Sequence, residues 1–199
     1  MADILLDGLP VLDLLEITPS TSVVARITQR DQSSISRIYR QVSRRLGLEF
    51  RKHTDGRYRA GCNQLLLEGL RLSSQWLRLQ NTPAEPRWMA CGPAALTSSA
   101  ELLNQPPALI QQGDEMKRIE ALLLERVLDL AVFTWPEAAR SASHPALVEL
   151  PLLRHAGGVD GIVLRRDLQE QPALQALIAA IRHSYQQQLR QHPEQDWLG

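Results

Sequence analysis

One short stretch of the chain collects side chains that can bind a polyanion. It runs from Asp31 to Gly47, reads DQSSISRIYRQVSRRLG, and contains no carboxylate after Asp31. Glutamine can pair with the adenine edge, arginine with the guanine edge, and serine with bases or phosphates. At helical spacing its apolar residues form one stripe, and most of its polar residues fall on the other face. The stripe consists of Ile35, Ile38, Val42 and Leu46.

The charge distribution favours a binding helix, although the helical spacing alone would favour an ordinary amphipathic surface helix. Residues 20–59 hold ten Arg and Lys against three Asp and Glu, a net charge of +7, although the whole chain has a formal net charge of zero. A solvated helix usually mixes charges at i,i+4 spacing, and this one scarcely does. A basic block beside an acidic remainder indicates that one end of the chain binds a polyanion.

Shorter elements should position this helix. The apolar pattern predicts a helix over 9–17, followed by a second, serine-capped helix. After Gly47, two β-prone runs flank His53-Thr54-Asp55-Gly56, and Asp-Gly between such runs is a strong hairpin signal. We expect this hairpin to be a basic wing suited to phosphate or minor-groove contacts. Its basic residues are Arg51, Lys52, His53, Arg57 and Arg59.

A longer helix is predicted over 63–80, where leucines recur at alternating spacings of four and three. The expected seam is Leu66, Leu70, Ser73 and Leu77. The apolar surface is wider than a lone surface helix needs, so part should pack on the preceding domain and part on a second copy of the chain. The polar, proline-containing segment NTPAEP at 81–86 then marks a domain boundary.

Beyond this boundary, short apolar runs alternate with helical patterns. The predicted strands are 87–91, 108–112, 128–133, 147–153 and 162–166, and the predicted helices are 94–103, one that begins at Asp114, and 172–191. Strand and helix alternating in this order predict a parallel α/β sheet with right-handed crossovers. The expected fold class is therefore mixed α and α/β.

The sequence contains no motif for catalysis or metal binding. There is no P-loop, GxGxxG, GxSxG or HExxH, so we expect neither an enzyme nor a cofactor. The two cysteines, Cys62 and Cys91, stand far apart without a CxxC, and no metal site is expected. No window is apolar over the length of a membrane span, and the N-terminus has no leader pattern, so we expect a cytoplasmic protein without membrane contact.

Residues up to about 80 resemble the N-terminal winged helix-turn-helix of LysR-type transcriptional regulators. The pattern SxxSxxxRQVSRRLGLEF, a basic hairpin and LLLEG follow one another as the family's recognition helix, wing and linker helix do. The matching residues are Gln32, Ile35, Ser36, Arg37, Leu46, Gly47 and Leu65 to Glu68. Three positions depart from the pattern: Asp31 stands for the usual Ser, Ser33 for Pro, and Ala60 for Thr.

The resemblance implies a sequence-specific regulator that binds double-stranded DNA as a homodimer through its linker helix. Residues expected to face bases are Gln32, Ser33, Ser34, Ser36 and Arg37. Residues expected to hold phosphates are Arg40, Arg51, Lys52, Arg57 and Arg59. The expected domains are a winged helix-turn-helix domain over 1–62, a linker and dimerisation helix over 63–82, and a reduced effector-like α/β domain over 86–199.

The second half also resembles the family's effector domain, which is similar to periplasmic binding proteins. Thr97 and Ser98 stand where that domain opens toward its ligand, and LDLAV at 128–132 matches its later strand, with Arg126 in place of a glycine. A full effector domain has two subdomains and is about twice as long. We therefore expect a single subdomain that lacks the ligand cleft, with Thr97 and Ser98 as weak ligand residues. A rival alignment treats LVELPLL as the crossing into a second subdomain that is then cut short.

Two other interpretations remain open. The chain could be a shortened regulator that pairs with a full-length relative and alters that partner's DNA binding, with the α/β lobe as a partner surface. It could also be a small-molecule-binding α/β protein whose basic end serves another purpose. Co-purification with a longer partner would favour the first, and tight ligand binding without DNA affinity would favour the second.

Overall fold

The chain forms two compact units, residues 1–77 and 78–199. The computed structural model describes residues 4–18, 20–52, 54, 58–81, 86–91, 115–135, 144–189 and 196–198. The division between the units falls inside helix α4 (Gln64–Gln80), so one helix contributes residues to both.

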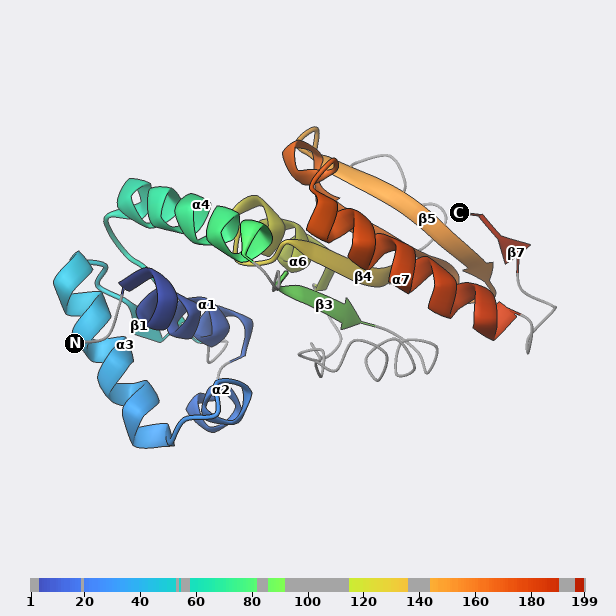
Figure 1. The fold of residues 1–199 in the computed structure, drawn as a ribbon. Coiled ribbons are helices and arrows are strands. Elements are labelled where there is room, and N and C mark those ends of the chain that lie inside the picture. The colour runs from blue at the N-terminus through green and yellow to red at the C-terminus, as the bar shows by residue number, and fades with distance from the viewer. Residues whose placement is uncertain are drawn as a thin grey trace. The chain divides into compact units, whose positions relative to one another are not determined.

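Three helices pack around the apolar core of residues 1–77 (Figure 1). They are α1 (Leu9–Ile17), α2 (Thr21–Ile27) and α3 (Gln32–Leu46), preceded by a π-helical turn, η1 (Ile4–Gly8). Ser20 caps α2, and Asp31 caps α3 by accepting the N–H of Ser34. Gly47 closes α3 at φ 60°, a left-handed conformation that glycine adopts without strain. The helix expected over Asp31–Gly47 is thus present with both of its expected caps.

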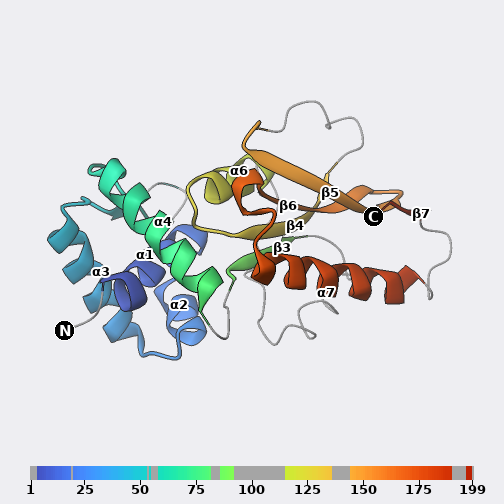
Figure 2. The same ribbon diagram turned by 45° about the horizontal axis from the view of Figure 1, so that its top comes forward.

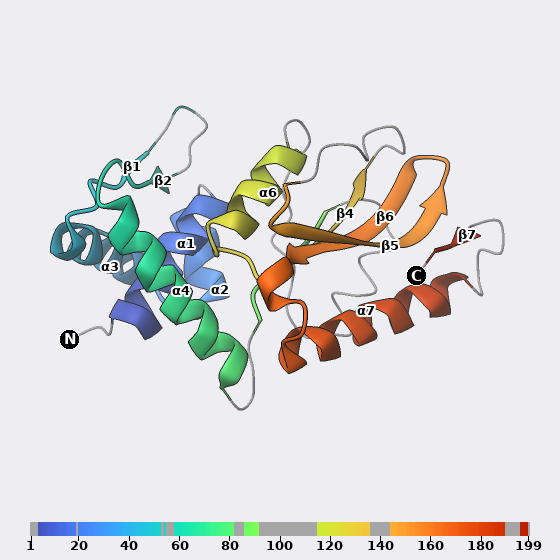
Figure 3. The ribbon, with the colours of Figure 1, turned by 90° about the horizontal axis from the view of Figure 1, so that it is seen from above.

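A short antiparallel hairpin follows α3 along the chain (Figure 3). Its strands are β1 (Arg51–Lys52) and β2 (Tyr58–Arg59). The Tyr39 hydroxyl donates to the Phe50 carbonyl at 2.8 Å, and its ring lies edge-on to those of Phe50 and Tyr58. Burial raises the pKa of Tyr39, and the neighbouring Tyr58 adds to this. The hairpin is therefore held in a fixed position relative to α3.

Burial on α4 is reversed relative to an ordinary surface helix. Arg71, Ser74 and Gln75 are buried, whereas four leucines of the same helix are exposed. The exposed fractions are 85% for Leu65, 45% for Leu66, 39% for Leu72 and 42% for Leu77. Of the expected seam, Leu66, Ser73 and Leu77 are exposed, and Leu70 is half-buried against the core of its own unit.

A buried ion-pair cluster joins α4 to α1, and nothing in the sequence analysis anticipated it. The Arg71 Nε donates to Asp13 Oδ1 at 2.9 Å, and its Nη2 donates to Glu16 Oε1 at 2.7 Å. All three side chains are at most 7% exposed. Burial alone would lower the pKa of Arg71, but the charges of Asp13 and Glu16 raise it above its usual value.

The described residues of the range 78–199 form a five-stranded mixed sheet, in the order β3-β4-β6-β5-β7. Its strands are β3 (Trp88–Cys91), β4 (Leu130–Trp135), β5 (Leu147–His155), β6 (Gly158–Arg165) and β7 (Asp196–Trp197). Only the β3–β4 pairing among these strands is parallel. The expected parallel pairing is present between β3 and β4 but does not extend to the rest of the sheet, because β5 and β6 form a hairpin with a tight turn at Ala156–Gly157, and such a turn can join only antiparallel neighbours.

Helices cover the sheet of residues 78–199 on its two sides. α7 (Pro172–Leu189) packs along one face, where Ile178, Ile181 and Tyr185 join the main apolar cluster (Figure 2). α6 (Glu115–Leu124) lies on the other side of the sheet and buries Ile119 and Leu123. A short 3-10 turn, η3 (Arg166–Leu168), leads from β6 toward α7. The helix expected over 94–103 and the strand expected over 108–112 lie outside the described residues.

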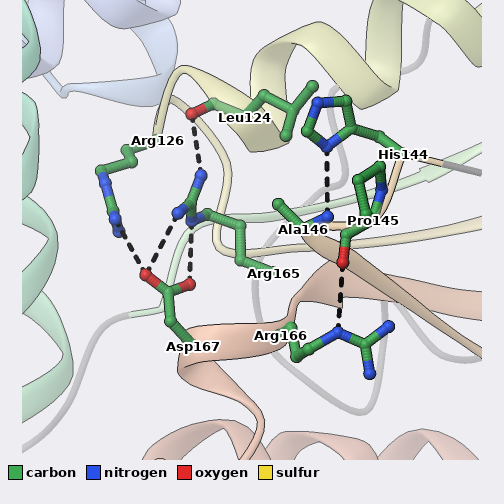
Figure 4. Close-up of polar contacts among 8 residues, drawn as sticks. All are labelled: Leu124, Arg126, His144, Pro145, Ala146, Arg165, Arg166 and Asp167. Atoms are coloured by element: carbon green, nitrogen blue, oxygen red, sulfur yellow. Dashed lines mark hydrogen bonds and ion pairs between the residues drawn. The ribbon is translucent and has the colours of Figure 1, made fainter.

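Arg126 closes the end of α6 in a conformation that usually requires glycine. Its φ is 61°, and its N–H donates to the Leu123 carbonyl at 3.1 Å. Figure 4 shows its guanidinium and that of Arg165 meeting at the carboxylate of Asp167. Burial alone would raise the pKa of Asp167, but hydrogen bonds from Arg165 and Arg126 lower it below its usual value. The arginine thus occupies the glycine position of the family pattern and uses its side chain to tie α6 to η3.

Candidate nucleic-acid interface

The polar face of α3 is exposed and carries the predicted residues in a row. Gln32, Ser33, Arg37 and Arg40 are exposed, and Ser34 and Ser36 are half-buried. Part of this face is a shallow hollow lined by Ser33, Ser36, Arg37, Arg40, Gln41, Arg44 and Arg45. The hollow adds Gln41, Arg44 and Arg45 to the residues expected to bind, and a signal for them was present in the basic and amide side chains that recur along α3 without an acidic residue among them.

The serines at the start of α3 are oriented by Asp31. The Ser33 hydroxyl donates to Asp31 Oδ1 at 2.5 Å, and the Ser34 hydroxyl donates to Oδ2 at 2.7 Å. The Ser34 N–H donates to Oδ1 at 2.8 Å. The bond from Ser33, followed by those from Ser34, holds the pKa of Asp31 well below its usual range. Because a hydroxyl has a single proton, both serine oxygens are left as hydrogen-bond acceptors toward a ligand.

Gln32 is also held in place by a neighbouring helix. Its Nε2 donates to the Thr21 Oγ1 of α2 at 2.9 Å. A primary amide has two N–H donors and one carbonyl acceptor. One N–H and the carbonyl of Gln32 therefore suffice for the paired contact with adenine N7 and N6 that glutamine makes.

The hairpin presents its basic residues on both of its faces. Arg51 and Arg59 are register partners, as are Lys52 and Tyr58. Register partners share a face of the ladder, so Arg51 and Arg59 lie on the face opposite to Lys52. Arg51 also forms an exposed ion pair with Glu49 at 3.0 Å. Arg57, one of the five residues predicted to hold phosphates, lies outside the described residues.

The start of α4 is fixed to the end of α3. Asn63 Nδ2 donates to the carbonyls of Leu46 and Gly47 at 3.0 and 3.1 Å, and the Cys62 thiol donates to the Gly47 carbonyl. Side-chain donors thereby satisfy carbonyls that the end of a helix leaves without partners. Helix, hairpin and α4 are joined at one point, which fixes where α4 begins.

Other predicted features fall outside what the structure describes. Thr97 and Ser98, the expected weak ligand residues, are not among the described residues. Within the described ranges, no three His, Cys, Asp or Glu side chains gather in a way that could hold a metal ion. None of the helices in those ranges is long and apolar enough to cross a membrane.

Several solved structures align with most of this chain. Full-length OxyR from Pseudomonas aeruginosa aligns at a TM-score of 0.50 and 11% identity, over 88% of this chain and 96% of that one. An OxyR variant from Corynebacterium glutamicum aligns at 0.48 and 10% identity, over 92% and 93%. A LysR family transcriptional regulator aligns at 0.33 and 13% identity, over 73% of this chain and 57% of that one.

Comparison with protein-family models and with curated proteins finds no match. At 11% identity the likeness to the Pseudomonas OxyR is a likeness of fold. The structural neighbours are LysR-family regulators, so the resemblance inferred from the sequence is confirmed at the level of the fold.

Proposed function

We propose that this chain, which has the fold of LysR-type regulators, is a sequence-specific DNA-binding transcriptional regulator that works as a dimer. The observation that carries the proposal is the exposed face of α3, where serine and glutamine side chains share a shallow hollow with four arginines. Amide and hydroxyl groups beside a row of cations suit a duplex, because cations bind its backbone and the other groups read its bases. The net charge of +7 over residues 20–59 supports the same partner.

Under this proposal α3 is a recognition helix and the β1–β2 hairpin is its wing. Gln32 and Arg37 read base edges in the major groove, and Ser36 lies beside them. Arg40, Arg51, Lys52, Arg57 and Arg59 hold phosphates, and Gln41, Arg44 and Arg45 extend the contact along the groove. Arg51 and Arg59 lie on one face of the hairpin and Lys52 on the other. In this proposal the two faces therefore contact the phosphates of different DNA strands.

Ser33 and Ser34 have a narrower role than sequence alone suggests. Their protons are donated to Asp31, so toward a base they only accept. The major-groove donors are the amino groups of adenine and cytosine, whereas guanine and thymine present acceptors at the equivalent positions. These serines therefore select adenine or cytosine on the strand that they face.

The outward leucines of α4 support dimerisation through this helix. Leu66 and Leu77 are separated by about three helical turns and lie on the same side, beside the exposed Ser73. A strip of exposed leucine on one helix gains most of its stability by packing on another apolar strip. A second copy of α4 supplies such a strip by symmetry, since a twofold axis brings the same residues together.

Residues 78–199 serve, in this proposal, as a reduced effector unit that acts mainly as a protein-binding surface. The described part of this unit forms one five-stranded sheet. A ligand held by a single lobe buries less of its surface than the roughly 70–90% usual for a drug-sized ligand. DNA binding should then respond little to small metabolites, and Thr97 and Ser98 should contribute weakly.

Selection of bound duplexes from a random pool tests the proposal. The full chain should enrich a two-part motif, and it should bind that motif about a thousandfold or more tighter than a scrambled duplex at fixed salt, which is the lower end of the usual range of specificity ratios. Arg37→Ala should remove the enrichment, and Lys117→Ala, an exposed cation on α6, should leave it unchanged. Equal affinity for the motif and for scrambled DNA would show that the protein does not recognise a DNA sequence.

A further inference from the structure

The Arg71 cluster connects two helices with a geometry that apolar packing lacks. Asp13 and Glu16 are three residues apart on α1, so they lie on one face about a turn from each other. Arg71 reaches both from α4, one through Nε and the other through Nη2. The guanidinium is planar and its donors have fixed directions. Contact with two positions on α1 therefore fixes both where α4 crosses α1 and how α4 is rotated.

Packing of leucines alone would fix the crossing angle between α4 and α1 less closely. Crossing angles between helices scatter by about 15–20° around their preferred values. α4 has 17 residues and is about 25 Å long, so a tilt of about 8° moves its far end by about 3.4 Å. That displacement equals about one base-pair step along DNA. An unclamped α4 would place a second DNA-binding unit with an error of one or two base pairs.

The rest of the buried face of α4 fits this requirement. Arg71, Ser74 and Gln75 are at most 3% exposed and follow Leu67 along the helix. Their polar groups need directed hydrogen bonds, which resist the sliding that apolar contacts permit. The buried polar face of α4 thus contributes less hydrophobic stabilisation than leucines would. In return, it holds α4 in a single register.

We propose that Arg71, through Asp13 and Glu16, is a positioning residue that sets the spacing between the two DNA half-sites read by the dimer. This inference rests on the proposed function and deepens it. The clamp contacts no base and no phosphate. It fixes the angle at which α4 leaves its own α1–α3 core, and hence the separation of the two recognition helices.

A set of duplexes that carry two copies of the selected half-site, with their centres moved apart one base pair at a time, tests the proposal. The wild-type chain should bind best at one spacing, and its affinity should fall at least tenfold two base pairs away. The variant Asp13→Leu/Glu16→Met/Arg71→Met replaces the cluster with apolar side chains of similar size. It should bind a single half-site within threefold of wild type and vary by less than threefold across the spacings.

Two further variants keep the outcome decisive. Arg71→Lys retains the charge but loses the fork, so it should broaden the optimum even if the triple variant does not fold. Glu68→Gln, an exposed acid on the same helix, should keep the wild-type optimum. A sharp optimum retained in Arg71→Lys, or in a folded triple variant, would overturn the clamp. A wild-type chain that dimerises but has no preferred spacing would overturn the clamp as well. A wild-type chain that stays monomeric and gains no affinity from a second half-site would instead overturn the proposed dimer.

Discussion

Arg51 and Arg59 lie directly opposite each other as register partners in the β1–β2 ladder. Like charges at such positions destabilise a hairpin by roughly 0.2–1 kcal/mol. An exposed ion pair with Glu49 compensates Arg51 only in part, because exposed pairs contribute about 0–1 kcal/mol. A phosphate on this face could accept hydrogen bonds from both guanidinium groups and reduce the repulsion between them.

Removing either arginine should therefore weaken binding to every duplex without changing which sequence is preferred. For Arg59→Ala and for Arg51→Ala, the slope of log affinity against log salt should become shallower by about 0.9, the value for one phosphate contact. Titrations at several salt concentrations, on selected and scrambled DNA, measure this slope. Lys117→Ala should keep the wild-type slope, and an unchanged slope for both hairpin variants would exclude the wing from the interface.

Gln32→Ala should act on one base pair. Loss of a paired contact with adenine costs about 1–3 kcal/mol, and only on duplexes that carry that adenine. Thr21→Val should produce part of the same effect, because it removes the acceptor that orients the Gln32 amide. Affinities for single-base variants of the selected site provide the measurement, and equal losses on all duplexes would make Gln32 a backbone contact.

Asp31→Asn should relax recognition at the positions that Ser33 and Ser34 face. Asparagine still caps α3 through its carbonyl, but it cannot accept the protons of both serines as the carboxylate does. The freed hydroxyls can then donate to guanine or thymine. Repeated selection with the variant should show all four bases where wild type prefers adenine or cytosine, and an unchanged preference would contradict the acceptor role.

Leu66→Glu combined with Leu77→Glu should yield monomers. These should bind a single half-site and should lose the higher affinity that a duplex with two half-sites gives the dimer. Both side chains are exposed, so the fold of residues 1–77 should tolerate the change. Leu70 is unsuitable for this test because it packs partly against its own core. Light scattering gives the mass, with Gln80→Glu as a control that adds charge to α4 without removing a leucine. A dimer that persists in the double variant would move the interface elsewhere.

At position 126 a glycine variant should be more stable than an alanine variant, whereas inside a helix alanine is the more stabilising of the two. At φ 61° a side chain with a Cβ costs about 1–2 kcal/mol, and glycine avoids this cost. Arg126→Gly should therefore be more stable than Arg126→Ala by about 1 kcal/mol in urea unfolding. At Lys117, inside α6, the order should be reversed by about the same amount. An alanine variant as stable as the glycine variant would mean that residue 126 changes conformation when its ion pair is lost.

Local signals in the sequence were sufficient to locate α3 and its ends. Asp31 and Gly47 are residue types whose side chain or backbone freedom favours the two caps, and the apolar stripe between them fixes the buried face. The predicted binding residues on α3 are exposed or half-buried for the same reason. Their contacts with Thr21 and Asp31 depend on how neighbouring groups meet in three dimensions, so spacing alone did not indicate them.

Long-range pairing could not be read in the same way. Strands were expected over 147–153 and 162–166 and are present as β5 and β6, but the alternation of strand and helix that predicts a parallel sheet lies earlier in the chain and does not give their direction. Gly157-Gly158 between two apolar runs is the local signal for the turn that joins them. Asp13 and Glu16 stood out as acids in an apolar helix, but their partner lies 58 and 55 residues away, beyond any periodic pattern.

In the proposed dimer, the outward leucines of α4 make DNA binding depend steeply on the abundance of the protein. Each seam needs two chains, so while most chains are unpaired, halving their number leaves about one quarter of the dimers. Occupancy of a paired site on DNA then falls faster than the supply of protein. Dilution by cell growth would be enough to release such sites, with no ligand bound and no chain degraded.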